Sequence, residues 1–257
     1  MASQNLFLLR EFIRRDFKGR YAGSMLGLLW SFLQPLWNLL LFTFIFSVVL
    51  KISPIGERTD NFAIFLFCGL LPWTALQEGV MRASTAITDN SNLVKKVSFP
   101  SELLVLSVVG AALLHEAIAG GLFLVVLVAV GEFAWKGLPL LLLAVPIQLA
   151  LTAGLGLLLA SVNVFFRDTA QVLGMVFMGW FYLTPIVYPV ALLPERFRSW
   201  IDLNPAATLV ALYRQALLGG GLVPPAGTLR LAAISLVLLA SGLLLFRRLR
   251  VAFADEI

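Results

Sequence analysis

Six long runs of apolar residues, separated by short polar stretches, form the main pattern along this chain. They cover about residues 26–50, 62–81, 103–131, 138–162, 170–190 and 229–246. A helix needs about 20 mostly apolar residues to cross the roughly 30 Å hydrocarbon core of a bilayer. The pattern therefore predicts an all-α membrane protein with six transmembrane helices, built as a single domain over residues 1–257.

The composition supports a membrane protein. Hydrophobic residues make up 60% of the chain, charged residues only 13%, and the mean hydropathy is +0.94. This leaves too little polar surface to cover a soluble globule. The net charge of +5 lies at the ends of the apolar runs, which favours lipid headgroups over nucleic acid as its partner. With Cys68 as the only cysteine, no intrachain disulfide or cysteine-based metal site can form.

The distribution of basic residues predicts the orientation of the spans. Most of the 19 Lys and Arg residues fall on one side, namely Arg10, Arg14, Arg15, Lys18, Arg20, Arg82, Lys95, Lys96, Arg167, Arg247, Arg248 and Arg250. Cytoplasmic loops carry an excess of Lys and Arg, so we expect this side to be cytoplasmic. Six spans return the chain to its starting side, so both termini are expected there.

Residues 1–24 are predicted to form an amphipathic helix, over about residues 4–20, that lies in the cytoplasmic interface. One face of this helix is apolar and is formed by Leu6, Leu9, Ile13 and Phe17. The opposite face is basic and is formed by Arg14, Arg15 and Lys18, with Arg20 at its end. Such a helix binds anionic lipid headgroups through its basic face. The alternative is that it serves only as an anchor.

Two connections between spans carry more apolar residues than solvated loops need. The predicted cytoplasmic segment 82–101 contains Leu93, Val94 and Phe99, which suggests that a partner packs against it. The predicted outer segment 191–228 is rich in Pro and Gly, and residues 203–218 within it have helical spacing of Leu and Tyr. That helix is too short to span, so we expect a re-entrant or surface helix that covers a pore mouth.

Covalent chemistry finds little support in the sequence. No nucleophile motif and no phosphate-binding loop is present, so ATP hydrolysis would require another chain. His115 and Glu116 lie inside the third apolar run, where ionisable groups are costly and often functional. We favour an interface or dimer-contact role for this pair, and an ion-coupled secondary transporter that uses it remains the alternative.

Aromatic residues suggest how a pore could be lined. Trp37, Tyr182 and Tyr188 are the candidates, with Phe177 and Phe181 beside them. Aromatic faces tolerate sliding, which suits a sugar chain that moves without a fixed pose. Pro35 and Pro185 lie next to these rings and are expected to kink the first and fifth spans. The alternative is that the rings form interfacial belts or pack between helices.

Several short motifs occur in an order and spacing that resemble a known family. They are Arg15-Asp16-Phe17-Lys18 with Arg20-Tyr21, Gly23-Ser24, Leu26-Gly27-Leu28-Leu29-Trp30, Pro35, Gly69-Leu70-Leu71-Pro72-Trp73, Asn92-Leu93-Val94-Lys95-Lys96-Val97, Phe99-Pro100, Phe166-Arg167-Asp168, Pro185-Ile186-Val187-Tyr188 and Leu203-Asn204-Pro205. The chain resembles, nearly end to end, the ABC-2-type permeases that export bacterial cell-surface polysaccharide, including O-antigen, capsule and teichoic acid.

The resemblance implies the partners of this chain. It implies a homodimer of six-span subunits in the bacterial inner membrane, joined by two cytoplasmic ATPase subunits that bind ATP and Mg, while this chain itself holds no cofactor. The docking residues would be Asn92, Leu93, Val94, Lys95, Lys96, Phe99 and Pro100. Segment 191–218 would gate the outer mouth. The expected substrate is a lipid-linked polysaccharide, O-antigen above all, and an ABC-2-type exporter of drugs or small hydrophobic molecules is the alternative. His115-Glu116 has no counterpart in the family pattern.

Overall fold

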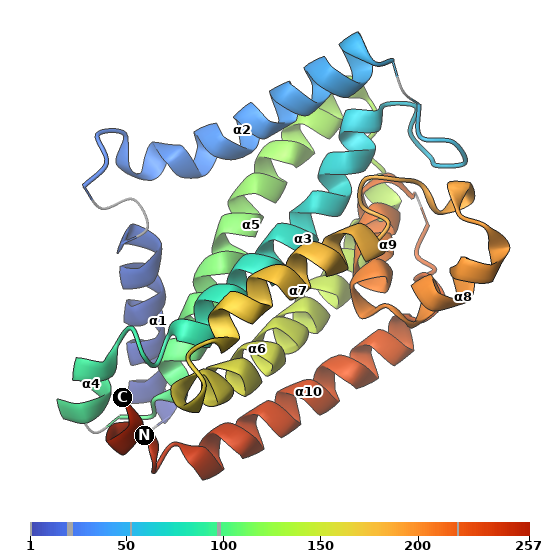
Figure 1. The fold of residues 1–257 in the computed structure, drawn as a ribbon. Helices are drawn as coiled ribbons and strands as arrows, with labels where there is room; N and C mark the ends of the chain where they lie inside the picture. Colours follow the sequence, from blue (N-terminus) through green and yellow to red (C-terminus); the bar gives the residue numbers. More distant parts are fainter. Residues whose placement is uncertain (1, 20–22, 52, 97–98, 220) are drawn as a thin grey trace.

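Helices form the whole fold of the residues that the computed structural model describes, which are 2–19, 23–51, 53–96, 99–219 and 221–257, and no strand occurs among them (Figure 1). The α-helices are α1 (Ala2–Gly19), α2 (Trp30–Phe42), α3 (Phe62–Thr85), α4 (Ser91–Lys96), α5 (Glu102–Val130), α6 (Leu141–Phe165), α7 (Thr169–Leu183), α8 (Glu195–Leu203), α9 (Pro205–Leu218), α10 (Thr228–Leu249) and α11 (Phe253–Glu256). Three short 3₁₀ segments are η1 (Gly27–Leu29), η3 (Trp135–Leu140) and η4 (Val190–Leu192), and η2 (Thr43–Val49) is a π-helix.

Five of these helical stretches are long and apolar enough to cross a membrane. They are Trp30–Val49, Phe62–Thr85, Glu102–Val130, Trp135–Phe165 and Thr228–Leu249, which correspond to five of the six predicted spans. The multi-pass, all-helical prediction is thereby confirmed at this level.

The remaining predicted span, the fifth at 170–190, was predicted to extend too far at its C-terminal end. Helix α7 has 15 residues and ends at Leu183, so its length is about 22 Å at 1.5 Å per residue. The residue before a proline disfavours helical backbone, and Thr184, which precedes Pro185, is extended with ψ 131°. The prediction that Pro185 kinks this span was wrong, because the proline follows the helix.

Helix α3 occupies the centre of the bundle and packs against α5, α6, α7 and α9. Within the 18-residue apolar stretch of α3, 72% of the residues are buried, whereas 22% are buried in the corresponding stretches of α5 and of α10. Its first turn is capped by Asn61, whose Oδ1 accepts hydrogen bonds from the backbone N–H groups of Ala63 (3.0 Å) and Ile64 (3.4 Å). Most of α3 is therefore surrounded by other helices of the protein rather than by lipid.

Two glycines allow α6 and α10 to approach closely. A Cβ on Gly154 would lie 2.6 Å from the backbone carbon of Leu238, and a Cβ on Gly242 would lie 2.7 Å from the carbonyl oxygen of Gly154. Small residues at such crossings let helix backbones come into contact, which is how membrane helices pack. This contact fixes α10 on the outside of the bundle, as Figure 1 shows.

The predicted helix within residues 203–218 is present as α9 and its apolar face is buried. It begins with Pro205, and Oδ1 of Asn204 accepts a hydrogen bond from the backbone N–H of Ala206 (3.0 Å).

Helix α8, which precedes α9, lies at the opposite end of the molecule from α4 (Figure 1). Both ends of the chain lie near α4 in the same view.

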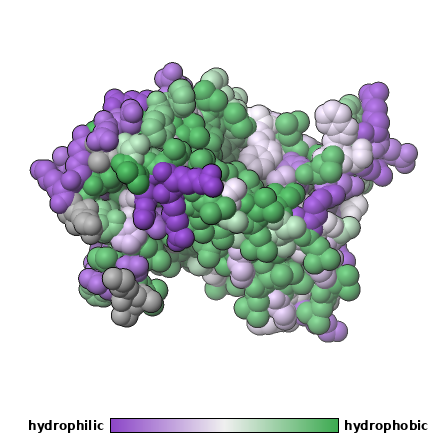
Figure 2. Space-filling model, turned by 90° about the horizontal axis from the view of Figure 1, so that it is seen from below, coloured by the Kyte–Doolittle hydropathy of each residue, from purple (hydrophilic) through white to green (hydrophobic). Residues whose placement is uncertain are grey.

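The surface has the polarity of a membrane protein. Figure 2 shows hydrophobic side chains over the middle of one face, while hydrophilic groups gather toward the side of α1 and α4 and toward the opposite side. Large apolar side chains such as Leu142, Leu229 and Val237 are exposed on α6 and α10. An apolar surface of this extent is compatible with lipid and incompatible with water.

Candidate functional site

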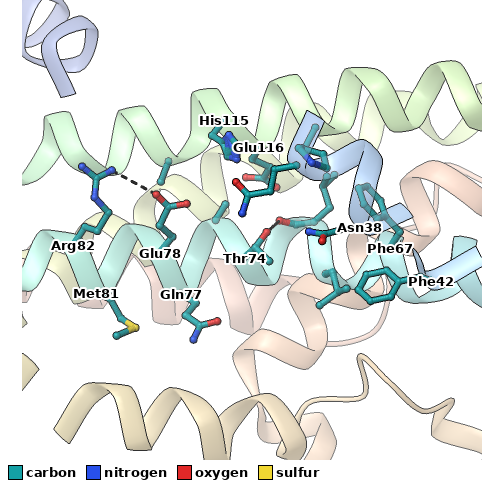
Figure 3. Close-up of a pocket in the computed structure, with 17 residues that line it drawn as sticks. Asn38, Phe42, Phe67, Thr74, Gln77, Glu78, Met81, Arg82, His115 and Glu116 are labelled. Atoms are coloured by element: carbon teal, nitrogen blue, oxygen red, sulfur yellow. Dashed lines mark hydrogen bonds and ion pairs between the residues drawn. The ribbon is translucent and has the colours of Figure 1, made fainter. Parts of the chain in front are cut away.

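A pocket of about 500 Å³ opens between α2, α3 and α5 and is lined by polar side chains at the depth of the apolar helices (Figure 3). We name it the polar groove, and its polar lining consists of Gln34, Asn38, Thr74, Gln77, Glu78, Arg82, His115 and Glu116. The four groove residues of α3 follow helical spacing and share one face of that helix. Amide, hydroxyl and carboxylate groups offer hydrogen bonds to a hydroxyl-rich ligand.

A buried hydrogen-bonded pair includes Glu116, one of the residues that line the polar groove. Nε2 of Gln148, on α6, donates to Oε2 of Glu116 (2.7 Å) and to the carbonyl oxygen of Pro72 (3.3 Å). Gln148 is fully buried and Glu116 is nearly so. Glu116 also borders, together with Tyr213 of α9, an apolar pocket of about 250 Å³ between α5, α6 and α9. The carboxylate is therefore positioned by three helices.

The polar groove also connects to the N-terminal helix. Nη2 of Arg82 pairs with Oδ1 of Asp16 on α1 (2.7 Å), and its Nη1 pairs with Oε1 of Glu78 (3.5 Å), a contact drawn in Figure 3. Asp16 and Arg82 are partly exposed, so this pair contributes modestly to stability. The ion pair links the amphipathic helix α1 to Arg82, a residue that lines the groove.

Helix α1 has the predicted amphipathic character. Arg14, Arg15 and Lys18 are exposed, and Leu9, Ile13 and Phe17 are half-buried, whereas Leu6 is exposed. The helix packs along α5, where a Cβ on Gly110 would lie 2.8 Å from Cδ1 of Ile13. Arg20 lies outside the described residues.

Two of the predicted pore aromatics pack inside the protein. The Trp73 ring lies at the centre of an aromatic cluster, 5.8 Å from Phe177, 5.6 Å from Trp180 and 5.7 Å from Phe181 between ring centroids. Phe177 is 2% exposed and so offers no surface to a pore in this conformation. These rings hold α7 against α3, as edge-to-face aromatic contacts do. The sequence placed Phe177 on the correct helix but on the wrong face.

The other aromatic candidates are partly or largely accessible and belong to two separate parts of the chain, α2 and the segment around the end of α7. Trp37 and Tyr182 are each 60% exposed, and the Tyr188 hydroxyl donates to the carbonyl oxygen of Tyr182 (3.0 Å). Helix α2 packs on α3 and α5, whereas α7 packs on α3 and α6. Trp37 and Tyr182 thus lie on two helices that share α3 as a neighbour.

The predicted docking segment contains α4, but its apolar side chains face inward. Leu93, Val94 and Phe99 pack partly buried against the core formed by α3, α5, α6 and α10, and the Phe99 ring lies 5.8 Å from that of Phe12 on α1. Pro100 is half-buried. Asn92, Lys95 and Lys96 are exposed. The surface offered to a partner is thus basic and polar, not the apolar one that the sequence suggested.

The sequence reading did not identify Gln148 or Arg214, although each is a polar residue inside an apolar stretch. Arg214 on α9 donates to the carbonyl oxygens of Pro185 (2.8 Å) and Ile186 (3.0 Å), and its guanidinium carbon lies 3.7 Å from the Phe65 ring centroid. Burial lowers the pKa of Arg214 to about 10, which still leaves it charged at neutral pH. Arg214 thereby ties the chain after α7 to α3 and α9.

Comparison with known proteins identifies the family. The family described as ABC-2 type transporter matches residues 8–218. The chain belongs to this family. It is 36% identical to the O-antigen export system permease protein RfbA of Myxococcus xanthus over 253 residues, which cover 97% of this chain and 95% of that protein.

Further relatives match over similar lengths. The RfbA protein of Klebsiella pneumoniae is 30% identical over 258 residues, covering 96% of this chain and 94% of that protein. The polysialic acid transport protein KpsM of Escherichia coli is 27% identical over 237 residues, covering 91% and 90%. As a member of the ABC-2 type transporter family, the chain is a membrane transport subunit without a catalytic domain.

Proposed function

We propose that this chain is the permease of an ATP-driven exporter that moves a lipid-linked polysaccharide, O-antigen, outward across the bacterial cytoplasmic membrane. The observation that carries the proposal is the 36% identity to an O-antigen export permease over 97% of the chain. The polar groove supports it, because amide and carboxylate side chains at membrane depth suit a hydroxyl-rich substrate better than a purely apolar one.

In this proposal a separate ATPase chain binds ATP and Mg and docks at α4. The exposed Lys95 and Lys96 support a docking surface for an acidic partner. The ATPase states would bias the permease between conformations through differential contacts at this surface. The end of the molecule that holds α4 and both chain ends would then be cytoplasmic, with short α7 completing the set of six crossings.

We further propose that the permease acts as a homodimer. The rings of Trp37 on α2 and Tyr182 on α7 are each 60% exposed in one copy, which leaves surface for a second copy to cover. In a symmetric pair, α2 of one copy could face α7 of the other, which would gather the aromatic residues along one path. The segment that contains α8 and α9 would cover the outer mouth of that path.

The test is deletion of the gene followed by complementation with the wild-type chain and with empty vector. We expect loss of O-polysaccharide from the cell surface on deletion, accumulation of the lipid-linked glycan inside, and recovery with the wild-type chain. Unchanged surface glycan together with altered sensitivity to hydrophobic drugs would overturn the proposal in favour of a small-molecule exporter. Export that persists after loss of the ATPase chain but stops on collapse of the proton gradient would favour the ion-coupled alternative.

A further inference from the structure

A second polar pocket, of about 290 Å³, lies at the end of the bundle where α6 passes into α7 and where α4 packs. We name it the α6–α7 pocket, and its polar lining consists of Thr85, Thr88, Ser91, Asn163 and Arg167; Ala170 in the first turn of α7 and Ile257 complete the lining. It shares no residue with the polar groove. Because α3 and α6 both end beside it, the pocket lies where their apolar spans meet the polar edge of the membrane.

A buried amide borders this pocket. Asn163 is 3% exposed, and its Oδ1 is buried and accepts no hydrogen bond from the described residues. Its amide nitrogen makes no hydrogen bond with them either. The orientation of an Asn amide group is inferred from its hydrogen-bond partners, so either the oxygen or the nitrogen of Asn163 can face the pocket. Buried polar groups are normally hydrogen-bonded. A ligand with oxygen atoms in the pocket would accept a hydrogen bond from this amide N–H, whereas Oδ1, itself an acceptor, would still need a donor.

The pocket also contains a cationic side chain, that of Arg167. Arg167 is exposed, and in the described part of the chain no carboxylate pairs with it. At the same end of the bundle, Arg82 pairs with Asp16, and Arg247 and Arg250 pair with Glu102. Arg167 is thus available to bind an anion, and a guanidinium matches the geometry of phosphate oxygens.

Backbone and hydroxyl donors complete the site. The first turn of a helix presents N–H groups without intrahelical acceptors, and Ala170 places that turn of the 15-residue α7 at the pocket. Ser91 adds a hydroxyl. The nearby Asp89 carboxylate does not line the pocket, and its Oδ2 accepts a hydrogen bond from Oγ1 of Thr85 (2.7 Å).

We infer that the α6–α7 pocket binds a phosphate group, and that its source is the headgroup of a phosphorylated membrane lipid. Arg167 and the N-terminus of α7 would bind the phosphate oxygens, and Asn163 would donate an amide N–H from below. The position of the pocket at the membrane edge favours a lipid over free phosphate, because acyl chains can then extend along the apolar helices. This inference rests on the membrane location of the chain and not on the nature of the exported substrate.

The experiment measures lipid binding to the purified full-length permease by native mass spectrometry. The probes are dioleoyl phosphatidic acid and dioleoylglycerol, which differ only by the phosphate. We expect the first to bind and the second not to. We expect Arg167→Gln to weaken phosphatidic acid binding about tenfold, as for loss of one charge-assisted hydrogen bond. Arg248→Gln removes an exposed charge from α10, outside the pocket, and is expected to leave binding unchanged.

Further measurements test whether the α6–α7 pocket is the binding site and whether the bound phosphate belongs to a lipid or is free. Asn163→Leu should weaken phosphatidic acid binding while leaving the protein in the membrane, and Ser91→Ala provides a milder variant of the same wall. Displacement of phosphatidic acid by millimolar inorganic phosphate would support phosphate recognition but assign the site to the free anion. Equal binding of both lipids, or an equal loss in Arg167→Gln and Arg248→Gln, would overturn the inference.

Discussion

Nε2 of Gln148 on α6 donates a 2.7 Å hydrogen bond to Oε2 of Glu116 on α5, and both residues are buried, with Glu116 lining the polar groove. The sequence indicated that Glu116 was unusual but not which group would bind it. Buried polar groups within a membrane protein persist where other protein groups satisfy them. The hydrogen bond therefore fixes the position of the Glu116 side chain, while Oε1 of Glu116 and Oε1 of Gln148 have no hydrogen-bond partner among the described residues.

We predict that Gln148→Leu destabilises the protein by about 1–3 kcal/mol, because it leaves the Glu116 carboxylate buried without its donor. The double variant Glu116→Leu with Gln148→Leu should recover part of this loss, since no unpaired polar group remains. Thermal denaturation of the purified protein in detergent measures both. Gln171→Leu, an exposed change on α7, is the control. Strictly additive losses in the double variant would show that the two side chains do not stabilise each other.

The polar groove predicts a defect in transport rather than in folding. Gln34 and Asn38 line it from α2. Replacing both with Leu should lower export about tenfold, because two hydrogen-bonding groups for a hydroxylated substrate are lost. Surface glycan measured in cells, normalised to permease in the membrane, tests this. Normal export by the double variant would place the substrate path elsewhere.

The docking segment predicts a division between its charged and apolar residues. Lys95→Glu with Lys96→Glu should reduce co-purification with the ATPase and stimulation of ATP hydrolysis, because these are the exposed groups of α4. Leu93→Asp should instead reduce the amount of folded permease, because Leu93 packs on the protein's own core. Lys136→Glu, an exposed change in η3 far along the chain, is the control. If the Leu93→Asp protein is stable but fails to bind the ATPase, Leu93 contacts the ATPase directly, as the sequence suggested.

The C-terminal segment predicts a matched pair of phenylalanine variants. Phe253 is fully buried, with ring centroids 5.1 Å from Phe246 and 6.3 Å from Phe165, whereas Phe166 is 70% exposed. Phe253→Ala should cost about 3–5 kcal/mol through the cavity it leaves. Phe166→Ala should change stability by no more than about 0.5 kcal/mol. Equal melting temperatures for the two variants would show that α11 does not stabilise the bundle.

The sequence by itself determined the membrane class, five of the spans, the amphipathic α1 and the presence of a short helix at α9. These features depend on hydropathy and spacing within one stretch of chain, and such local patterns persist whatever surrounds them. The motifs also identified the family, since their order along the chain does not depend on packing.

Tertiary structure alone decided which way the site residues face. Phe177 contacts Trp73 instead of a pore, and Leu93 faces its own core instead of a partner. In both cases helices distant in sequence bury an apolar face. The local sequence pattern predicts which face of a helix is apolar, but it does not predict which helix covers that face. The same holds for Gln148 and Glu116, because a buried hydrogen bond between two spans is fixed only by how the helices approach and rotate.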